Sequence, residues 1–168
     1  MAAGDLLCSA LTPRPPITNA ASLESRAGGS TDNEGFDVWA FDASSSEKLD
    51  FYGAMSPRYV GAALKVRVPV IAASATTGNV GLAAAFRRLD TAEDLDASHS
   101  YSEQSVTAAV SATNGCPTYA EIAFTAAQID SLAASEAFVL RLRRDVTVGS
   151  NAAGDAQVLP WGVQIIET

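Results

Sequence analysis

The chain is poor in the residues that many enzymes use for chemistry. Its 168 residues include one histidine, His99, and two cysteines, Cys8 and Cys116. A Ser-His-Asp triad needs a histidine that is oriented by a carboxylate and aimed at a nucleophile, and no G-x-S-x-G segment occurs here. A structural zinc site needs four ligands, usually nitrogen or sulfur, more than these three residues supply. We therefore expect His99 to be a solvated loop residue in a protein that is not an enzyme.

The spacing of the few cysteines is equally uninformative for chemistry. Cys8 and Cys116 form neither a CxxC motif nor a metal-ligand pattern, so we expect no disulfide between them and no metal site. The glycine pair Gly28-Gly29 is not followed by Lys-Ser or Lys-Thr, which excludes a P-loop. The chain is thus predicted to have no catalytic, cofactor-binding or metal-binding residue, and no cofactor.

Positive charge is scarce. The 11 Lys and Arg residues face 19 Asp and Glu residues, which gives a formal net charge of −8. Nucleic-acid binding depends on Lys and Arg displacing counterions from phosphates, so a nucleic-acid partner is excluded. The densest acidic run, residues 90–96, lacks the glycine and distal glutamate of an EF-hand loop, and we expect a solvated acidic loop.

Long hydrophobic runs are absent as well. No stretch approaches the roughly 20 apolar residues that a membrane-spanning helix needs, so no membrane contact is expected. Residues 1–14 lack the basic start and the apolar length of a signal peptide. The sequence therefore predicts a protein made in a cytoplasm.

The first 35 residues differ from the rest of the chain. Pro13, Pro15 and Pro16 disfavour helix, and residues 19–35 are rich in small and polar residues without a hydrophobic period. This composition predicts an extended N-terminal arm over residues 1–35 that orders only against a partner.

Residues 36–168 follow the period of two that is typical of half-buried strands. We expect about eight strands, which contain the segments 36–41, 49–51, 64–70, 80–86, 106–110, 120–124, 138–142 and 158–165. Pro69 lacks an amide donor, so its strand is expected at an edge or bulged there. The alanines 83–85 are assigned to a strand, and one short helix is expected within residues 126–134. Strands separated by Gly, Pro, Asn and Asp predict an antiparallel sandwich.

A carbohydrate-binding β-sandwich needs exposed aromatic rings as stacking platforms. Trp161 alternates with Val163 and Ile165, and Trp39 shares a face with Phe41, so we expect both tryptophans in the core. Tyr52, Tyr59, Tyr101 and Tyr119 are left as candidate surface aromatics, which keeps a sugar-binding module as an alternative.

From about Phe41 onward the chain resembles a family of small jelly-roll virion proteins of tailed phages. The resemblance covers roughly three quarters of the chain and depends on the order and spacing of its motifs. These motifs are Phe41-Asp42, Pro57-Arg58-Tyr59-Val60-Gly61, Thr77-Gly78-Asn79-Val80, Phe86-Arg87-Arg88, Asp94-Leu95-Asp96, Ile122-Ala123-Phe124, Ile129-Asp130-Ser131-Leu132, the strand Phe138 to Asp145, and Gly154-Asp155-Ala156. Residues 1–35 lie outside the resemblance.

The resemblance implies a virion structural protein without an active site. We expect a jelly-roll domain over residues 36–168 that forms a homotrimer on the capsid surface and binds the major capsid protein of a phage shell as a decoration, or cement, protein. The alternatives are a tail-tip or receptor-binding virion subunit and a carbohydrate-binding β-sandwich module.

Overall fold

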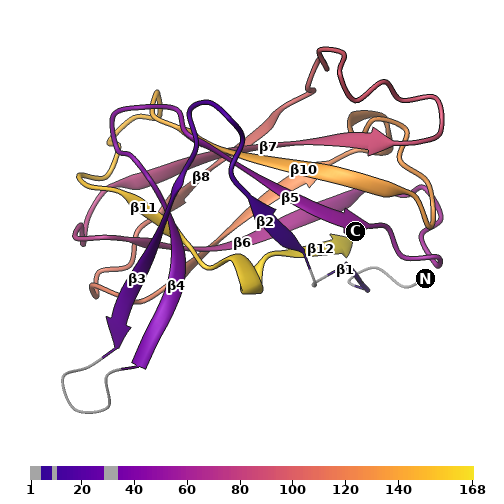
Figure 1. The fold of residues 1–168 in the computed structure, drawn as a ribbon. Helices are drawn as coiled ribbons and strands as arrows, with labels where there is room; N and C mark the ends of the chain where they lie inside the picture. Colours follow the sequence, from indigo (N-terminus) through magenta and orange to yellow (C-terminus); the bar gives the residue numbers. More distant parts are fainter. Residues whose placement is uncertain (1–4, 9–10, 29–33) are drawn as a thin grey trace.

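The computed structural model describes residues 5–8, 11–28 and 34–168, and it shows two antiparallel sheets packed face to face (Figure 1). The seven-stranded sheet consists of β1 (Leu6–Cys8), β3 (Ser22–Gly28), β4 (Glu34–Phe41), β6 (Leu64–Ala72), β9 (Thr118–Phe124), β11 (Ala156–Val158) and β12 (Gln164–Glu167). The five-stranded sheet consists of β2 (Thr12–Arg14), β5 (Lys48–Ala54), β7 (Asn79–Leu89), β8 (Gln104–Ala109) and β10 (Ala137–Asp145). The predicted all-β sandwich is confirmed.

The strand order is that of a jelly roll. One sheet contains the series β4-β11-β6-β9, and the other contains β5-β10-β7-β8. β11 and β12 occupy one position in this series, because both pair with β6 on the side opposite β9. From β4 to β11, consecutive strands thus alternate between the sheets except at the β7–β8 hairpin, as in double-sheet jelly rolls.

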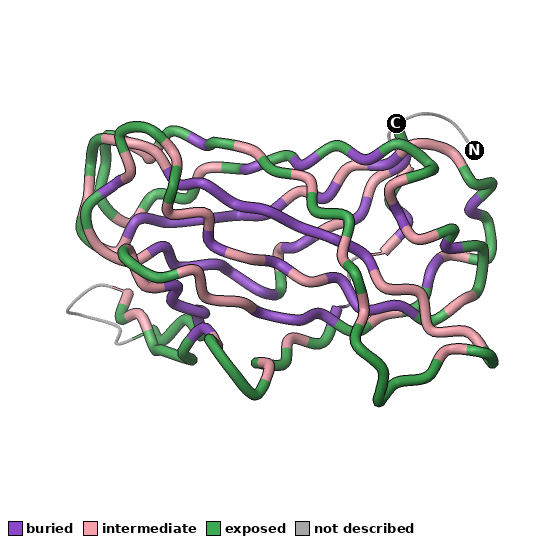
Figure 2. Tube along the Cα trace, turned by 90° about the horizontal axis from the view of Figure 1, so that it is seen from above, coloured by how far each residue is buried: buried purple, intermediate pink, exposed green. Residues whose placement is uncertain are grey.

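The core lies between the sheets and is built from alternate residues of each strand. Figure 2 shows the buried residues concentrated along the strands, with exposed residues mainly in the loops at both ends. The largest fully buried apolar side chains include Phe41, Phe51, Phe86, Phe138, Leu49, Leu64, Leu82 and Leu140. The alanines 83–85 lie in the middle of β7, as predicted, and every one of them is buried.

The N-terminal segment differs from the prediction. Its described residues form β1, β2 and β3, which pair with β12, β5 and β4 respectively. Leu7, Leu11 and Ala21 are buried in the main core. The prediction of an arm apart from the sandwich is therefore wrong for residues 5–8 and 11–28, whereas residues 1–4, 9–10 and 29–33 lie outside the described residues. The neighbouring strands supply the hydrogen bonds, so these three edge strands need no hydrophobic period of their own.

The prediction for Pro69 is also wrong. β6 is a central strand, with β9 on one side and β11 and β12 on the other. Pro69 falls where the neighbour changes from β12 to β11, so the one ladder bond that it cannot donate is missing at a junction rather than within a paired stretch.

Helical structure is limited to two single turns in the described residues. η1 (Ala126–Gln128) lies within the segment predicted to be helical, and η2 (Pro160–Gly162) separates β11 from β12. Among the described residues, no helix has the length and apolar character needed to cross a membrane.

Candidate functional site

A second, smaller apolar cluster lies on the outer face of the seven-stranded sheet. It consists of Val38, Ile71 and Leu159, each of which is at most 7% exposed. Trp39, Val70 and Val158 point into the main core from the same strands, so their neighbours along the chain point outward. An apolar cluster on an outer face needs cover from other side chains.

Trp161 contributes to this cover and is 63% exposed itself. The prediction that both tryptophans are core residues is confirmed for Trp39, which is 9% exposed, and is wrong for Trp161. Trp161 lies in η2 rather than in a strand, so its alternation with Val163 and Ile165 does not determine its side.

The orientation of Trp161 depends on Pro69. The Leu159 amide donates to the Pro69 carbonyl at 3.1 Å, but Pro69 has no amide to return to Leu159, as a regular antiparallel pair would. The Leu159 carbonyl accepts from the Gly162 amide at 3.1 Å instead, which closes the turn that carries Trp161. Gly162 then packs on the Pro69 ring, where a β-carbon would be 2.7 Å from Pro69 Cγ.

Phe36 lies next to Trp161 on the same outer face. It is 40% exposed, and a β-carbon on Gly28 would be 2.8 Å from its Cε2 atom. The absence of a side chain at Gly28 therefore lets the Phe36 ring lie across β3. The cross-strand partner of Phe36 is Arg26.

Arg26 is held by two uncharged side chains. Its Nη1 donates to Oε1 of Gln157 at 2.7 Å, and its Nη2 donates to Oδ1 of Asn114 at 3.3 Å. Gln157 is 7% exposed and in turn donates to Glu24 at 3.0 Å. Gly115 has a positive φ of 84°, and a β-carbon there would be 3.1 Å from Arg26 Nη2. The absence of a side chain at Gly115 therefore leaves room for the Arg26 guanidinium.

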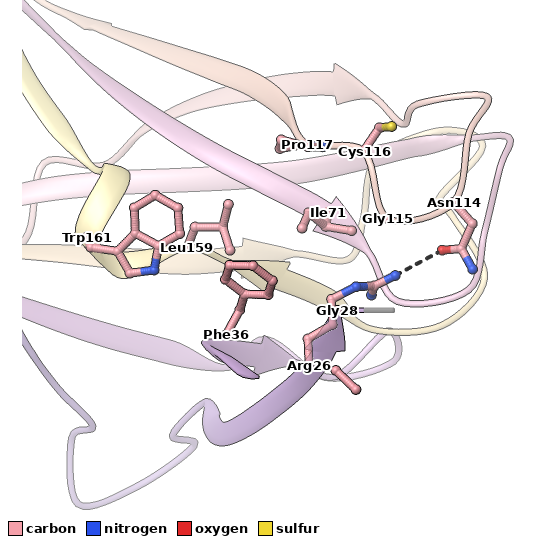
Figure 3. Close-up of a pocket in the computed structure, with 11 residues that line it drawn as sticks. Arg26, Gly28, Phe36, Ile71, Asn114, Gly115, Cys116, Pro117, Leu159 and Trp161 are labelled. Carbon is pink, nitrogen blue, oxygen red and sulfur yellow. Dashed lines mark hydrogen bonds between the residues drawn. The ribbon is translucent and has the colours of Figure 1, made fainter. Parts of the chain in front are cut away.

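These residues enclose a surface pocket of about 450 Å³, which we call the Trp161 pocket (Figure 3). Its lining consists of Arg26, Ala27, Gly28, Phe36, Ile71, Asn114, Gly115, Cys116, Pro117, Leu159 and Trp161. The Trp161 and Phe36 rings lie beside Leu159, and the hydrogen-bonded pair Arg26 and Asn114 lies at the other end. Its volume falls in the range of about 300–1,000 Å³ that is usual for small-molecule sites.

A third exposed aromatic ring lies beside the pocket. Tyr119 is 52% exposed and is the cross-strand partner of Pro69, against which Gly162 packs. The Arg67 guanidinium covers one face of the Tyr119 ring at 3.9 Å from the ring centroid. Arg67 also lies 3.7 Å from Glu121, so this part of the outer face is polar and already paired.

The outer face of the five-stranded sheet is covered by the loop between β7 and β8. Arg87 pairs with Glu93, and Arg143 pairs with Glu103, at 2.8 and 2.7 Å. The Arg141 guanidinium forms two hydrogen bonds of 2.7 Å with Asp50 and lies over the ring of Tyr101. Burial raises the pKa of the Tyr101 phenol, and the hydrogen bonds to Asp50 raise the pKa of Arg141.

Of the other tyrosines flagged by sequence, Tyr52 is 42% exposed on this second face, and Tyr59 is buried. The structure contains no disulfide between Cys8 and Cys116, both of which it describes. Cys116 is exposed and lines the Trp161 pocket, a position that nothing in the sequence signalled.

His99 is less solvated than predicted, with its side chain 15% exposed. Its Nδ1 lies 3.8 Å from Glu93, its Nε2 lies 3.5 Å from Asp130, and its ring packs edge-on against Tyr101. In the acidic run, Asp90 pairs with Arg88 at 3.0 Å. Across the described ranges, no group of three or more His, Cys, Asp or Glu side chains is placed to hold a metal ion.

Comparison with known proteins gives information on the fold alone. No protein-family model matches the sequence, and no curated protein matches it. A non-crystalline cellulose specific carbohydrate-binding module, CBM28, matches with a TM-score of 0.54 and 12% identity, over 93% of this chain and 88% of that chain.

Two further structures match less well. The CBM22-1 xylan-binding domain of Xyn10C from Paenibacillus barcinonensis has a TM-score of 0.46 and 11% identity, with 99% and 97% of the two chains covered. Tailspike protein 4 of bacteriophage CBA120 has a TM-score of 0.41 and 9% identity, with 94% of this chain and 19% of that chain covered. The resemblance to capsid decoration proteins gains no support from these comparisons. The chain has a β-sandwich fold that resembles those of carbohydrate-binding modules.

Proposed function

We propose that the protein is a carbohydrate-binding β-sandwich module that holds a glycan at the Trp161 pocket without transforming it. The observation that carries the proposal is the exposure of Trp161 on a closed turn beside the exposed ring of Phe36. Pyranose rings have apolar C–H faces that pack on aromatic rings, and Trp offers the largest such surface.

The polar end of the pocket suits the hydroxyl groups of a sugar. Arg26 and Asn114 present planar hydrogen-bonding groups whose positions are set by Gln157 and by each other. Groups that are held before the ligand arrives lose less entropy on binding, which favours affinity. The described lining residues include no Asp or Glu, whereas glycoside hydrolysis generally uses a pair of carboxyl groups. Binding without hydrolysis therefore fits this pocket best.

The test is substitution of the stacking ring. Trp161→Ala should weaken glycan binding by about 30-fold, which corresponds to the roughly 2 kcal/mol of a dominant contact residue. Binding partners would first be identified on a glycan array, and affinities then measured by isothermal titration calorimetry. Tyr52→Ala is the matched control, because Tyr52 is exposed on the opposite sheet.

Two results would contradict the proposal. One is that no glycan binds the wild-type protein. The other is that Trp161→Ala and Tyr52→Ala have the same effect. Because Trp161 is 63% exposed, its removal should leave thermal unfolding nearly unchanged, and a folding defect would show in the same samples.

A subunit interface is the second candidate for this face. Clustered exposed apolar residues such as Trp161, Tyr119 and Phe36 also suit a protein partner. The homotrimer, the capsid decoration role, the contact with a major capsid protein and the location on a virion stay predictions. Analytical ultracentrifugation separates the two candidates, because a trimer that becomes monomeric on Trp161→Ala substitution would assign the face to assembly.

A further inference from the structure

Arg26 is the one charged side chain among the described residues that line the Trp161 pocket. Six of the other cations lie within 4.0 Å of a carboxylate, namely Lys65, Arg67, Arg87, Arg88, Arg141 and Arg143. The remaining four, Arg14, Lys48, Arg58 and Arg144, have no such ion pair among the described residues, but none of them lines the pocket. Arg26 has no ion pair with any described residue, although the chain carries a formal net charge of −8. Among the described residues, Arg26 is therefore the one cation that is both without an ion pair and part of the pocket lining.

The hydrogen bonds of Arg26 leave some of its N–H donors without a partner among the described residues. A guanidinium has five N–H groups, and the bonds to Gln157 and Asn114 occupy two of them. Both acceptors are neutral amide oxygens, so they hold the side chain without neutralising it. Glu24, whose carboxylate could have done so, is engaged by the amide nitrogen of Gln157.

Arg26 is positioned to bind a negatively charged group of the sugar itself. Arg26 and Phe36 are directly opposite in the antiparallel pair β3–β4, which places their β-carbons about 4.5–5.5 Å apart. A pyranose that packs on the Phe36 and Trp161 rings therefore brings its exocyclic group near the guanidinium. Arg binds carboxylates through two parallel hydrogen bonds, which is stronger and more specific than contact with a hydroxyl.

We propose that the Trp161 pocket recognises an acidic glycan, in which a sugar carboxylate of the uronic acid type binds Arg26 while the sugar ring packs on Phe36 and Trp161. This inference rests on the proposed glycan-binding function and adds the class of sugar. It also explains why the pocket combines one unpaired cation with an apolar floor of Ile71 and Leu159.

The experiment compares polymers whose carboxyl groups are either free and charged or methyl-esterified and neutral. Polygalacturonate, alginate and hyaluronan are each measured by calorimetry against their methyl-esterified forms, together with neutral cellulose, xylan and galactan. At least one acidic polymer should bind at least 10-fold more tightly than its own ester. Arg26→Gln should remove this difference by weakening the binding of the acid form 10-fold or more while changing the binding of the ester little.

Arg58→Gln is the matched control, because it removes the same charge from an exposed arginine outside the pocket. Arg26→Lys keeps the charge but loses the two-pronged geometry, and its affinity for the acid form should lie between those of the wild type and Arg26→Gln. Thermal unfolding of each variant shows whether the fold is retained.

The outcomes separate this inference from the function on which it rests. Equal binding of acids and esters, binding of neutral polymers only, or equal weakening of both forms by Arg26→Gln would overturn the acidic-glycan inference and leave glycan binding intact. If no polymer binds the wild-type protein, the proposed function itself fails.

Discussion

Gly162 lies so close to Pro69 that a β-carbon added to the glycine would be 2.7 Å from Pro69 Cγ. This contact joins a turn near the C-terminus to the middle of the central strand β6. The proline leaves the Leu159 carbonyl available to Gly162, and the glycine permits the resulting turn to approach the proline ring. The exposed position of Trp161 thus depends on two residues that do not themselves offer a binding group.

Gly162→Ala should displace the turn that carries Trp161. The added methyl group meets a rigid proline ring, so the turn must move, and overpacking of this kind costs about 1–3 kcal/mol. We expect a loss of stability in this range by urea denaturation, together with at least 10-fold weaker glycan binding. Gly149→Ala is the control, because nothing lies within 4 Å of a β-carbon at that position. Similar behaviour of the two variants would refute the role assigned to Gly162.

Leu11→Ala should destabilise the sandwich although Leu11 belongs to the segment predicted to be an arm. Leu11 is 8% exposed and covers Gly53 of β5. Replacing a buried leucine by alanine costs about 2–5 kcal/mol, measured here as a lower denaturation midpoint in urea. Ile17→Ala, at a fully exposed position, should change stability by no more than about 0.5 kcal/mol. An unchanged midpoint for Leu11→Ala would mean that the segment does not contribute to the core.

Asn151→Ala should lower the free energy of unfolding more than Arg144→Met does, although Asn151 is only the hydrogen-bond acceptor of Arg144. Arg144 is fully buried, and its Nη2 donates to Asn151 Oδ1 at 2.7 Å. Its Nε and Nη1 have no hydrogen-bond partner among the described residues, and burial lowers the pKa of the guanidinium.

Without Asn151 the buried charge would lose its remaining side-chain acceptor, at a cost of about 3 kcal/mol. Arg144→Met removes the charge and fills much of the space, and should be neutral or stabilising. Chemical denaturation of both variants tests this order, and a larger loss for Arg144→Met would reverse it.

The stability of the protein should fall on acidification through the carboxyl groups of Asp42 and Asp145. Hydrogen bonds from Ser44 lower the pKa of Asp42, and those from Thr147 lower the pKa of Asp145. The unfolded chain, with an aspartate pKa of about 3.9, binds these protons more readily than the folded chain does. The stabilisation is therefore complete well above pH 4 and is lost as the pH falls through the lower folded pKa values.

The double variant Ser44→Ala, Thr147→Val tests this origin. Its unfolding midpoint in urea should depend less steeply on pH between about pH 2 and 5 than that of the wild type. A parallel pH profile for the two proteins would show that other carboxyl groups cause the acid sensitivity.

Cys116 should report on occupancy of the Trp161 pocket. Its thiol is exposed and lines the pocket, so a thiol reagent should modify it readily in the free protein. A glycan bound against Trp161 should slow this labelling by at least severalfold, as measured by intact mass in a Cys8→Ala background. Equal labelling rates with and without saturating glycan would place the ligand elsewhere.

Most of the sandwich could be predicted from the period of two, because each inward residue of a half-buried strand must be apolar. This holds for β4 to β10, including the alanine-rich centre of β7. The period could not predict β1, β2 and β3, since these edge strands obtain their order from the hydrogen bonds of a neighbour. Residues such as Leu7 and Leu11 are too few to form a pattern.

The pocket could be predicted only in part. The sequence shows Trp161 between Pro160 and Gly162, a local signal for a turn, but the regular spacing of Val163 and Ile165 favoured a strand instead. Arg26 and Phe36 are ten residues apart, Asn114 lies 78 residues after Phe36, and no motif in the sequence links the three. The β3–β4 pairing brings Arg26 opposite Phe36, and the loop before β9 brings Asn114 within hydrogen-bond distance of Arg26.

The sequence by itself determined an all-β sandwich, because the alternation of apolar and polar residues is set within each strand, whereas the order of the strands in the two sheets was decided by the tertiary structure. Only the tertiary structure decided that residues 5–8 and 11–28 join both sheets and that Trp161 faces solvent in the same pocket as Arg26. These features arise from contacts between distant segments, and above all from a missing amide at Pro69 whose effect appears some 90 residues later, at Gly162.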